Sequence, residues 1–298
     1  DMAFSRLRID TGGDTPVACL EFTQPLANDP QVNFADFITL TPAAQVNYQP
    51  VGNSLCLRGL PYDIDRQVTI REGFPAAGGA RTRKDETVNL TFGDRPSFVG
   101  FAGSGIILPR AEADGVGIET VNVSKLKIEV LRVSDRILSQ QTVDEGQAVA
   151  EGSYDFWSVE NAGEDVGVSV FKGELPVALK AENRNKTLTT VFPLGSVLKD
   201  RTAGAYVIRV YDASPAAGAR GENNDRPAAA SRWIVYTDMA LQTFSGATGM
   251  DVVVRSLKSA ATMSGVTLTL IAQNNDELAR ARSGGDGVDA MSAEDALV

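Results

Sequence analysis

The chain has 298 residues, of which 43% are hydrophobic and 22% are charged, a composition typical of folded globular protein rather than of disordered chain. All-β domains usually hold about 100 to 200 residues, so this length predicts two or three of them. The net charge of -10 argues against nucleic acid as a partner, because a phosphate-binding surface needs clustered Lys and Arg. The sequence contains no run of about 18 apolar residues, the length that a membrane-spanning helix needs.

Histidine is absent from the sequence, and its absence narrows the chemistry that the chain can perform. A Ser-His or Cys-His nucleophile pair is impossible, and a zinc site loses its commonest ligand. A pair of carboxylates, as glycosidases use, stays open. Aromatic residues, which sugar binding usually uses for stacking, are scarce, with only two Trp, Trp157 and Trp233. The strand pattern around Trp233 predicts a core position. We therefore predict no catalytic, cofactor-binding or metal-binding residue, and a protein that is not an enzyme.

A first domain is predicted over residues 1–94, where short runs with strand character are separated by turn residues. The runs cover residues 6–10, 17–26, 34–42, 54–60, 66–74 and 87–94. Their spacing of about 10 to 18 residues is typical of an antiparallel β-sandwich. The turn residues Asp94 to Pro96 mark the exit from this domain.

A second domain with long loops is predicted over residues 95–237. Its predicted strands lie within residues 98–110, 121–138, 166–175, 186–194, 204–213 and 231–238. In the second of these runs Leu126, Ile128 and Val130 alternate with Lys127, Glu129 and Leu131, a pattern that predicts a strand.

Two segments of the second domain lack a strand pattern. Asp144 to Asn161 is irregular, as expected of a short helix or a long excursion. Ala213 to Ala230 is rich in small, polar and turn-forming residues, a composition that predicts a mobile hairpin loop.

A third domain is predicted over residues 238–298, and it begins within about five residues of the strand before it. Two strands over residues 250–258 and 265–273 are followed by a turn at Asn274–Asn275 and a run over 277–283. The remaining tail offers at most one more strand, too little to complete a sandwich. We therefore expect this domain to be cut short and the natural chain to continue beyond Val298.

The two cysteines, Cys19 and Cys56, lie in apolar runs of the first domain, and each points away from the apolar face of its predicted strand. Neighbouring strands would bring the sulfur atoms together, so we predict a Cys19–Cys56 disulfide and an oxidising compartment. Two free thiols on separate strands are the alternative. The run from Cys19 to Phe22 resembles the start of a Cys-Leu-Glu-Gln thioester motif, but Phe22 has no amide to condense with the thiol.

Several polar motifs suggest ligand sites, but each is better explained as an ordinary turn, a solvated surface residue or a chance match. Gly100 to Gly105 superficially suggests a phosphate loop, yet a β-branched run and a proline follow it where a helix would have to begin. Three acidic pairs could ligate calcium, but none has the spacing of an EF-hand loop, and we expect solvated loop acids. These pairs are Asp63 with Asp65, Asp144 with Glu145, and Asp286 with Asp289. Three glycosylation sequons begin at Asn89, Asn122 and Asn185, a pattern that recurs by chance.

Longer runs resemble one family in consistent order. FTQPL, FITLTP and LCLRGLPYDIDRQVTIREGFPAAGG resemble the first macroglobulin-like domain of bacterial α2-macroglobulins. PSFVGFAGSGIILPR and VNVSKLKIEVLRVSDRIL resemble the opening of the next domain, and VVVRSLKSAATMSGVTLTLIAQNNDELARA resembles the domain after that. The chain departs from the family pattern in the acidic, glycine-rich run from Ser283 to Gly287.

The resemblance implies an all-β fold of tandem macroglobulin-like antiparallel sandwiches, related to immunoglobulin and fibronectin domains. It implies a structural, N-terminal shell segment of a broad-spectrum periplasmic protease trap, whose bait region and any thioester lie outside this chain. The implied partners are other domains of the same full-length chain and, through that chain, target proteases. No cofactor is implied, and anchoring to the inner membrane through a segment before residue 1 stays open.

Two other functions fit a chain of β-sandwiches. The first is a tandem immunoglobulin-like stalk of a bacterial adhesin or surface protein, which would also tolerate a disulfide and an acidic surface. The second is a set of accessory domains from a carbohydrate-active enzyme, which would have to bind sugars.

Overall fold

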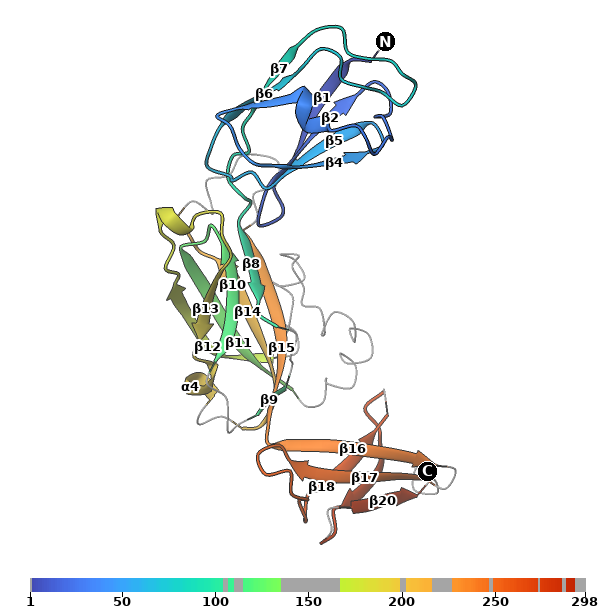
Figure 1. The fold of residues 1–298 in the computed structure, drawn as a ribbon. Helices are drawn as coiled ribbons and strands as arrows, with labels where there is room; N and C mark the ends of the chain where they lie inside the picture. The colour runs from blue at the N-terminus through green and yellow to red at the C-terminus, as the bar shows by residue number, and fades with distance from the viewer. Residues whose placement is uncertain are drawn as a thin grey trace. The chain divides into compact units, whose positions relative to one another are not determined.

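A computed structural model describes residues 2–103, 107–109, 115–134, 167–198, 202–215, 227–246, 249–272, 274–285 and 288–292. The regular structure in these ranges is almost entirely β-strand, as the sequence predicts (Figure 1). The helical segments that it does contain are short. They are η1 (Phe34–Phe37), η2 (Ala181–Asn183) and α4 (Leu194–Leu198). No helix in the described ranges is long and apolar enough to cross a membrane.

The chain divides into two compact units. Unit 1 consists of Asp1–Pro96 together with Lys180–Thr187, and unit 2 consists of Ser97–Leu179 and Leu188–Val298. Residues 180–187 thus fold with unit 1, although the sequence reading assigns them to the second domain. The boundaries at residues 94 and 237 stay a prediction.

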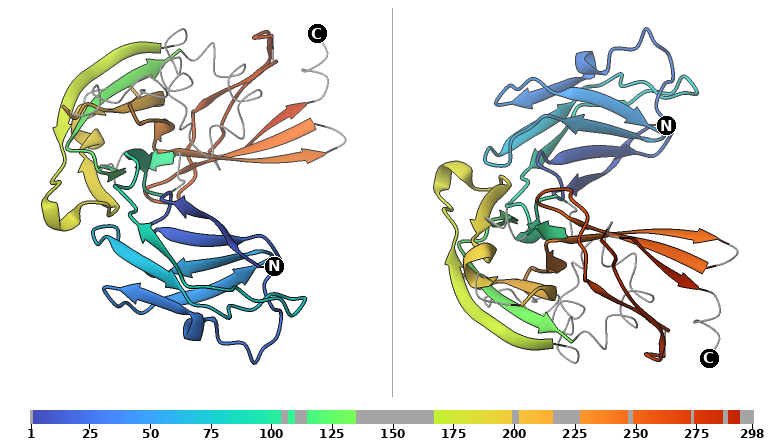
Figure 2. Two further views of the ribbon diagram at one scale, coloured as in Figure 1. Left: turned by 90° about the horizontal axis from the view of Figure 1, so that it is seen from above. Right: turned by 90° about the horizontal axis from the view of Figure 1, so that it is seen from below.

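Unit 1 contains a sandwich of two antiparallel sheets, coloured blue to teal in Figures 1 and 2. One sheet has the strand order β1-β2-β5-β4, and the other has the order β3-β6-β7. The strands are β1 (Phe4–Asp10), β2 (Val17–Phe22), β3 (Ile38–Thr41), β4 (Asn47–Val51), β5 (Ser54–Arg58), β6 (Arg66–Ile70) and β7 (Glu86–Leu90).

Apolar residues at every second strand position fill the core between these sheets. Ala18, Leu20 and Phe22 from β2 are buried in it, and the ring of Phe22 stacks on that of Phe74 with centroids 4.6 Å apart. Burial of such side chains stabilises the fold by about 1.5 to 3 kcal/mol each.

The strand expected over residues 34–42 begins only at Ile38, and this part of the prediction is wrong. The side chain of Asn33 accepts a hydrogen bond from the backbone N–H of Ala35, which caps the short helix η1. Phe34 points from that helix into the core, so its apolar character signals burial rather than a strand.

Unit 2 begins with a second sandwich. Its sheets have the strand orders β13-β10-β8 and β12-β11-β14-β15-β9, and all pairs are antiparallel except β9 with β15. The strands are β8 (Phe98–Phe101), β9 (Ile107–Pro109), β10 (Val116–Val121), β11 (Lys125–Val133), β12 (Gly167–Pro176), β13 (Leu188–Phe192), β14 (Gly204–Asp212) and β15 (Ala229–Thr237).

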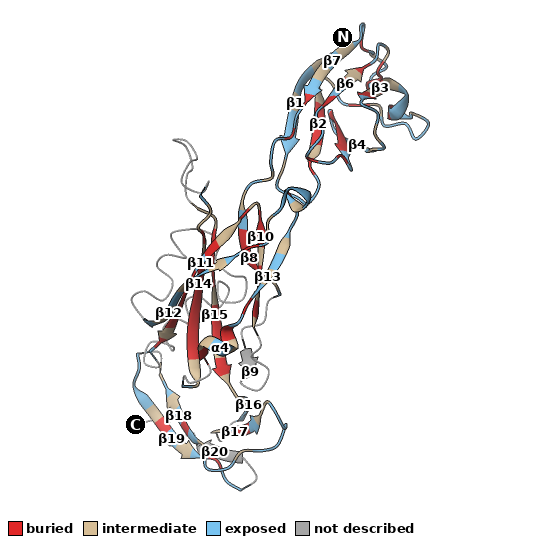
Figure 3. Ribbon diagram, turned by 90° about the vertical axis from the view of Figure 1, so that its left-hand side faces the viewer, coloured by how far each residue is buried: buried red, intermediate tan, exposed pale blue. Residues whose placement is uncertain are grey.

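The central strands of the larger sheet are buried on both faces, and β14 is largely red in Figure 3. Leu126, Ile128 and Val130 face the core between the sheets, as their alternation predicts. Leu131 and Trp233 belong to a second apolar cluster that also contains Val133, Ala205 and Val207. The core position expected for Trp233 is confirmed.

Unit 2 also contains a third, smaller set of strands around its own apolar core of Val252, Val254, Leu268 and Ala279. Its sheets have the orders β16-β17-β20 and β18-β19. The strands are β16 (Met239–Gly246), β17 (Gly249–Ser256), β18 (Thr267–Ile271), β19 (Glu277–Arg282) and β20 (Val288–Ser292). The expected turn is present, with Asn275 at φ 71°. Asp238 alone separates β15 from β16.

Candidate functional site

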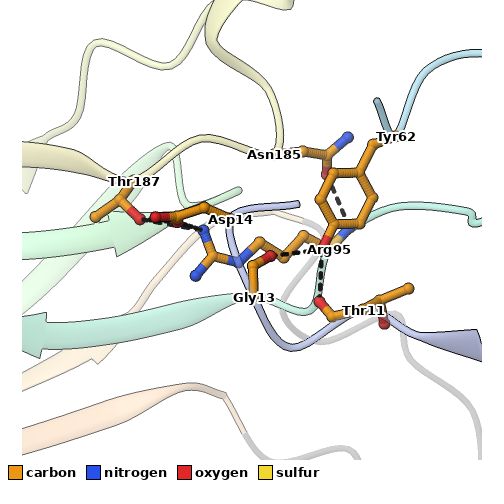
Figure 4. Close-up of polar contacts among 7 residues, drawn as sticks. All are labelled: Thr11, Gly13, Asp14, Tyr62, Arg95, Asn185 and Thr187. Atoms are coloured by element: carbon orange, nitrogen blue, oxygen red, sulfur yellow. Dashed lines mark hydrogen bonds and ion pairs between the residues drawn. The ribbon is translucent and has the colours of Figure 1, made fainter. Parts of the chain in front are cut away.

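A well-connected polar site lies in unit 1, where residues from three distant parts of the sequence meet around Arg95 (Figure 4). We call this site the Arg95 cluster and define it as Asp14, Asp94, Arg95, Arg184, Asn185 and Thr187. It joins the turn after β1, the segment after β7 and the segment 180–187.

Arg95 makes contacts through both its side chain and its backbone. Its Nη1 donates to Oδ1 of Asp14 at 2.7 Å and to Oγ1 of Thr187 at 3.1 Å. Its backbone N–H donates to Oδ1 of Asn185 at 2.8 Å. The side chain of Arg95 is only 13% exposed, but that of Asp14 is 79% exposed, so solvent screens this ion pair as it does a surface pair.

Asp94 forms the second ion pair of the cluster. Nε of Arg184 donates to Oδ1 of Asp94 at 2.9 Å, and Nη2 of Arg184 contacts Oδ2, so the pairing is bidentate. Nδ2 of Asn185 also donates to Oδ1 of Asp94, at 3.3 Å. The hydrogen bond from Arg184 holds the pKa of Asp94 below its usual value.

Asn185 connects the two ion pairs. Its backbone has a φ of 63°, a left-handed conformation that Asn adopts more readily than most residues other than Gly. The residue is 7% exposed, and its amide is bonded on both sides, to Arg95 and to Asp94. The sequon that begins at Asn185 therefore has a buried acceptor amide in the folded chain.

Tyr62 holds the turn that carries Asp14. Its hydroxyl lies 2.8 Å from the carbonyl oxygen of Thr11 and 2.7 Å from that of Gly13, so it donates its single proton to one of them at a time. Burial raises the pKa of Tyr62, which keeps the hydroxyl protonated. The ring packs edge-on against Phe92, with centroids 6.4 Å apart.

The segment 180–187 is shaped by its own polar side chains. The backbone N–H of Lys180 donates to Oδ1 of Asn183 at 2.6 Å, and Nζ of Lys186 donates to the carbonyl oxygen of Glu182 at 3.0 Å. These bonds close the short helix η2 and place Arg184, Asn185 and Thr187 together.

The Arg95 cluster is suited to holding chain segments together. Its groups are bonded to one another, and the hydroxyl of Thr187 lies between Asp14 and Arg95, donating to the first and accepting from the second. No group of three or more Cys, Asp or Glu side chains in the described ranges is placed to hold a metal ion.

The two cysteines occupy facing positions on β2 and β5 and form a disulfide, with an S–S distance of 2.01 Å. Both cysteines are 5% exposed. They lie on the face of the sheet opposite Ala18 and Leu20, as the alternation predicts, and Arg8 and Gln49 are their neighbours on the flanking strands.

A second polar site lies in unit 2, on the face of β11 opposite its core residues. Oε2 of Glu129 lies 2.6 Å from Nη2 of Arg209, and Oε1 lies 2.9 Å from Nζ of Lys172. Glu129 and Arg209 have side chains only 7% and 6% exposed. Burial alone would raise the pKa of Glu129, but hydrogen bonds from Lys172 and Arg209 outweigh it and lower the pKa to about 2.

The glycine-rich run after Phe98 meets an arginine. Gly100 lies in β8, and the carbonyl oxygen of Ala102 accepts a hydrogen bond from Nη1 of Arg232 at 3.1 Å. The Arg232 guanidinium also lies 4.7 Å from the ring centre of Phe101. The described part of this run therefore forms a strand that ends in a carbonyl group bonded to Arg232.

The other polar candidates are placed as follows. Asp63 and Asp65 are exposed in the segment before β6, and Asn89 is exposed in β7. Asn122 has a φ of 53° between β10 and β11. Asp289 is in β20. Trp157, Asp286, the pair Asp144 with Glu145, the segment Asp144 to Asn161 and most of the loop Ala213 to Ala230 lie outside the described residues.

Sequence reasoning missed both polar sites. The Arg95 cluster depends on a pairing between residues up to 173 positions apart, for which a single sequence carries no signal. Glu129 and Arg209 do carry one, because each is a charged residue directly between two apolar strand residues, Ile128 and Val130 for Glu129 and Ile208 and Val210 for Arg209. Opposite charges in two such strands indicate a buried pair.

Comparisons with known proteins agree with the order of these sandwiches. The family description "Bacterial alpha-2-macroglobulin MG2 domain" matches residues 100–214, and "Bacterial alpha-2-macroglobulin MG3 domain" matches residues 236–296. An alpha-2-macroglobulin from Xylella fastidiosa is 27% identical in a 201-residue alignment that covers 63% of this chain. The chain spans only 12% of the length of that relative.

Solved structures share the fold. A Salmonella alpha-2-macroglobulin mutant, Y1175G, matches with a TM-score of 0.65 and 20% identity over 99% of this chain and 17% of its own. An Escherichia coli alpha-2-macroglobulin fragment spanning domains MG0-NIE-MG1 matches with a TM-score of 0.53 and 20% identity over 98% of this chain and 90% of its own.

Proposed function

Because this chain belongs to the bacterial α2-macroglobulin family, we propose that it is a structural, non-enzymatic shell segment of a protease-trapping inhibitor. The segments that a protease would cut, and any thioester, lie outside residues 1–298 in this proposal. The contribution of this chain is to hold successive sandwiches in place while other parts of the protein engage the protease.

The observation that carries this proposal is the way polar groups are used in the described residues. In the Arg95 cluster and around Glu129, charged side chains bond to one another and connect segments that are far apart in the sequence. Side chains engaged in this way stabilise a scaffold and are not set up to attack a substrate.

We further propose that the protein works in the periplasm. The Cys19–Cys56 disulfide supports this location, because disulfides form and persist in oxidising compartments. Fractionation of cells that express the protein at natural level should find it in the periplasmic extract with both thiols blocked. Recovery from the cytosol with two reactive thiols would contradict the proposed location.

Protease protection tests the proposed function. A protease is incubated with the longest natural polypeptide that contains this chain, or with residues 1–298 alone, and is then assayed on a small peptide and on a large protein substrate. A trap blocks the large substrate and spares the small one, whereas the shell segment alone should block neither. Inhibition by residues 1–298 alone would refute the proposal, and so would a longer polypeptide that leaves both substrates open to cleavage.

A further inference from the structure

The first strand of the third set, β16, lies at the edge of its sheet and pairs only with β17 among the described residues (Figure 1). An edge strand offers unpaired N–H and C=O groups to other chains, and proteins usually protect long edge strands with charged side chains, bulges or proline. The other described edge strands of six or more residues, β1, β12 and β19, each carry charged residues and pair with a shift in register. The eight residues of β16 include no charged residue and no proline, and they pair without a shift.

The direction of the free main-chain groups on β16 follows from the hydrogen bonds of β17. The backbone N–H of Met263 donates to the carbonyl oxygen of Val254 at 2.9 Å, so the main-chain groups of Val254 point away from β16. In an antiparallel pair, the residue opposite such a position also points its main-chain groups away from the partner strand. Leu241 is opposite Val254, so Leu241, Thr243 and Ser245 direct their N–H and C=O groups to the free edge.

The sequence of β16 is complementary to itself in an antiparallel arrangement. A two-fold axis at Gln242 would place this residue opposite its own copy, and residues on one face would meet residues on the same face. Each large side chain would then be opposite a small one. These pairs are Met239 with Ser245, Leu241 with Thr243, and Phe244 with Ala240. Leu241 and Thr243 would also exchange main-chain hydrogen bonds, because both point these groups to the free edge.

The neighbouring residues of β17 agree with this arrangement. Phe244 lies beside Asp251, and Ala240 lies beside Arg255. Pairing about Gln242 would create a row of Asp251 and Phe244 followed by Ala240 and Arg255 of the second copy, with opposite charges at its two ends. Phe244 is 52% exposed, and Ala240 of the second copy would cover part of its ring. The arrangement therefore buries apolar surface and places no like charges in one row.

We propose that β16 pairs through its free edge with β16 of a second copy of this chain, so that two copies form a two-fold symmetric dimer with one continuous antiparallel sheet. The occupant is a second copy because the sequence of the strand itself supplies the matching side-chain sizes and charges. The inference depends on the edge and the residues of β16 and β17. It does not depend on protease trapping or on chain outside residues 1–298.

Cysteine cross-linking at the two-fold axis provides the first test. Gln242 would occupy a pair without main-chain hydrogen bonds, where opposite Cα atoms lie about 4.5 Å apart, a distance that a disulfide can span. In the longest natural polypeptide that contains this chain, Gln242→Cys should give disulfide-linked dimers under mild oxidation, with residue 242 of both copies in the linked peptide. Thr243→Cys is the matched control and should stay unlinked, because Thr243 would be opposite Leu241. Equal linkage in both variants, or none in Gln242→Cys, would overturn the proposal.

Sedimentation velocity provides the second test and needs no new cysteine. The natural polypeptide should sediment with the mass of two copies, and Ala240→Lys should reduce this to the mass of one copy, because a charged side chain would lie opposite Phe244. Thr189→Lys, at an exposed position on the edge strand β13, is the control and should leave the dimer intact. Amide exchange in β19 checks that each variant is folded.

Two results of the sedimentation experiment would overturn the proposal. One is a natural polypeptide that stays a single copy at increasing concentration, and the other is an Ala240→Lys variant that stays a dimer. Slow amide exchange of Leu241 and Thr243 in a single copy would assign the edge to another segment of the same polypeptide and would also overturn it.

Discussion

The hydroxyl of Thr187 donates a hydrogen bond of 3.1 Å to the carboxylate of Asp14, although 173 positions separate the two residues in the sequence. Asp14 accepts a second bond from Arg95 at 2.7 Å. The carboxylate thus joins the first turn of unit 1 to the returning segment 180–187. Closing a long stretch of chain costs conformational entropy, and several such hydrogen bonds must form together to offset that cost.

Removal of the Arg95 guanidinium should release segment 180–187. Arg95→Ala removes bonds to Asp14 and Thr187, and water can replace the lost donor at these exposed oxygen atoms, so the cost should be about 1 kcal/mol. Amide exchange of residues 181–187 should increase, and the urea midpoint of unit 1 should fall. Lys84→Ala, a change at an exposed residue outside the cluster, is the control. Unchanged exchange in Arg95→Ala would show that the rest of the cluster holds the segment.

Two substitutions of Asn185 should separate backbone strain from side-chain bonding. Asn185→Gly keeps a residue that tolerates a φ of 63° but loses the bonds to Arg95 and Asp94. Asn185→Ala loses the bonds and also strains the backbone, so it should lower the free energy of unfolding by about 1 kcal/mol more than Asn185→Gly does. Urea unfolding followed by the exchange of unit 1 peptides measures the difference. Equal losses would mean that the conformation at residue 185 carries no cost.

Replacement of both cysteines by alanine should destabilise unit 1 alone. The disulfide closes a loop of 37 residues, for which the chain-entropy estimate is about 4 kcal/mol. Amides in β2 and β5 should exchange faster in the double variant, while those in β11 and β14 keep their rates and provide the internal control. Faster exchange in both units would mean that the disulfide stabilises more of the chain than unit 1.

The buried pair of Glu129 and Arg209 should make unit 2 sensitive to acid. The pKa of Glu129 is lowered from 4.5 to about 2 in the folded chain. A carboxyl with a depressed folded pKa stabilises the fold above its unfolded pKa, and it loses that stabilisation as the pH falls toward the folded value. The contribution, of order 3 kcal/mol, should therefore disappear between about pH 5 and pH 2.

Glu129→Gln tests whether the stabilisation by Glu129 is lost as the pH falls. Near neutral pH it should unfold at lower urea concentration than the natural chain, because a buried guanidinium has lost its carboxylate counterion. At about pH 2 the two proteins should be nearly equal in stability. Glu174→Gln, at an exposed partner of Lys125, is the control and should change little at either pH. A constant difference across the pH range would show that Glu129 contributes by packing and not by its charge.

The sequence alone predicts many of the strands that have one apolar face, although it misses β10, whose Val116 and Ile118 are buried. β2 and β11 show the expected alternation, and their apolar faces point into the cores. β4 escapes detection because Asn47, Gln49 and Pro50 give it little strand character and it lies mostly exposed at the edge of its sheet. The segment that forms helix η1 is predicted to be a strand because Phe34 and Phe37 are apolar. The capping residue Asn33 is a weaker indication of a helix in the sequence.

The two polar sites could not be predicted from patterns of neighbouring residues. Alternation places Glu129 opposite the core, and it does lie there, but a second apolar cluster buries that face of the sheet as well. Segment 180–187 looks like an ordinary polar connection between two strands. Its bonding to Asp14 and Arg95 depends on tertiary contacts that no pattern of neighbouring residues encodes.

The assignment of Lys180–Thr187 to unit 1 makes that unit discontinuous in the gene. A recombination event that exchanged only the codons for residues 1–96 would bring in a new Arg95 and Asp14 but keep the old Arg184, Asn185 and Thr187. The two halves of the cluster must therefore be inherited together or change together. Relatives that share this arrangement should exchange the first two sandwiches as one block more readily than either of them alone.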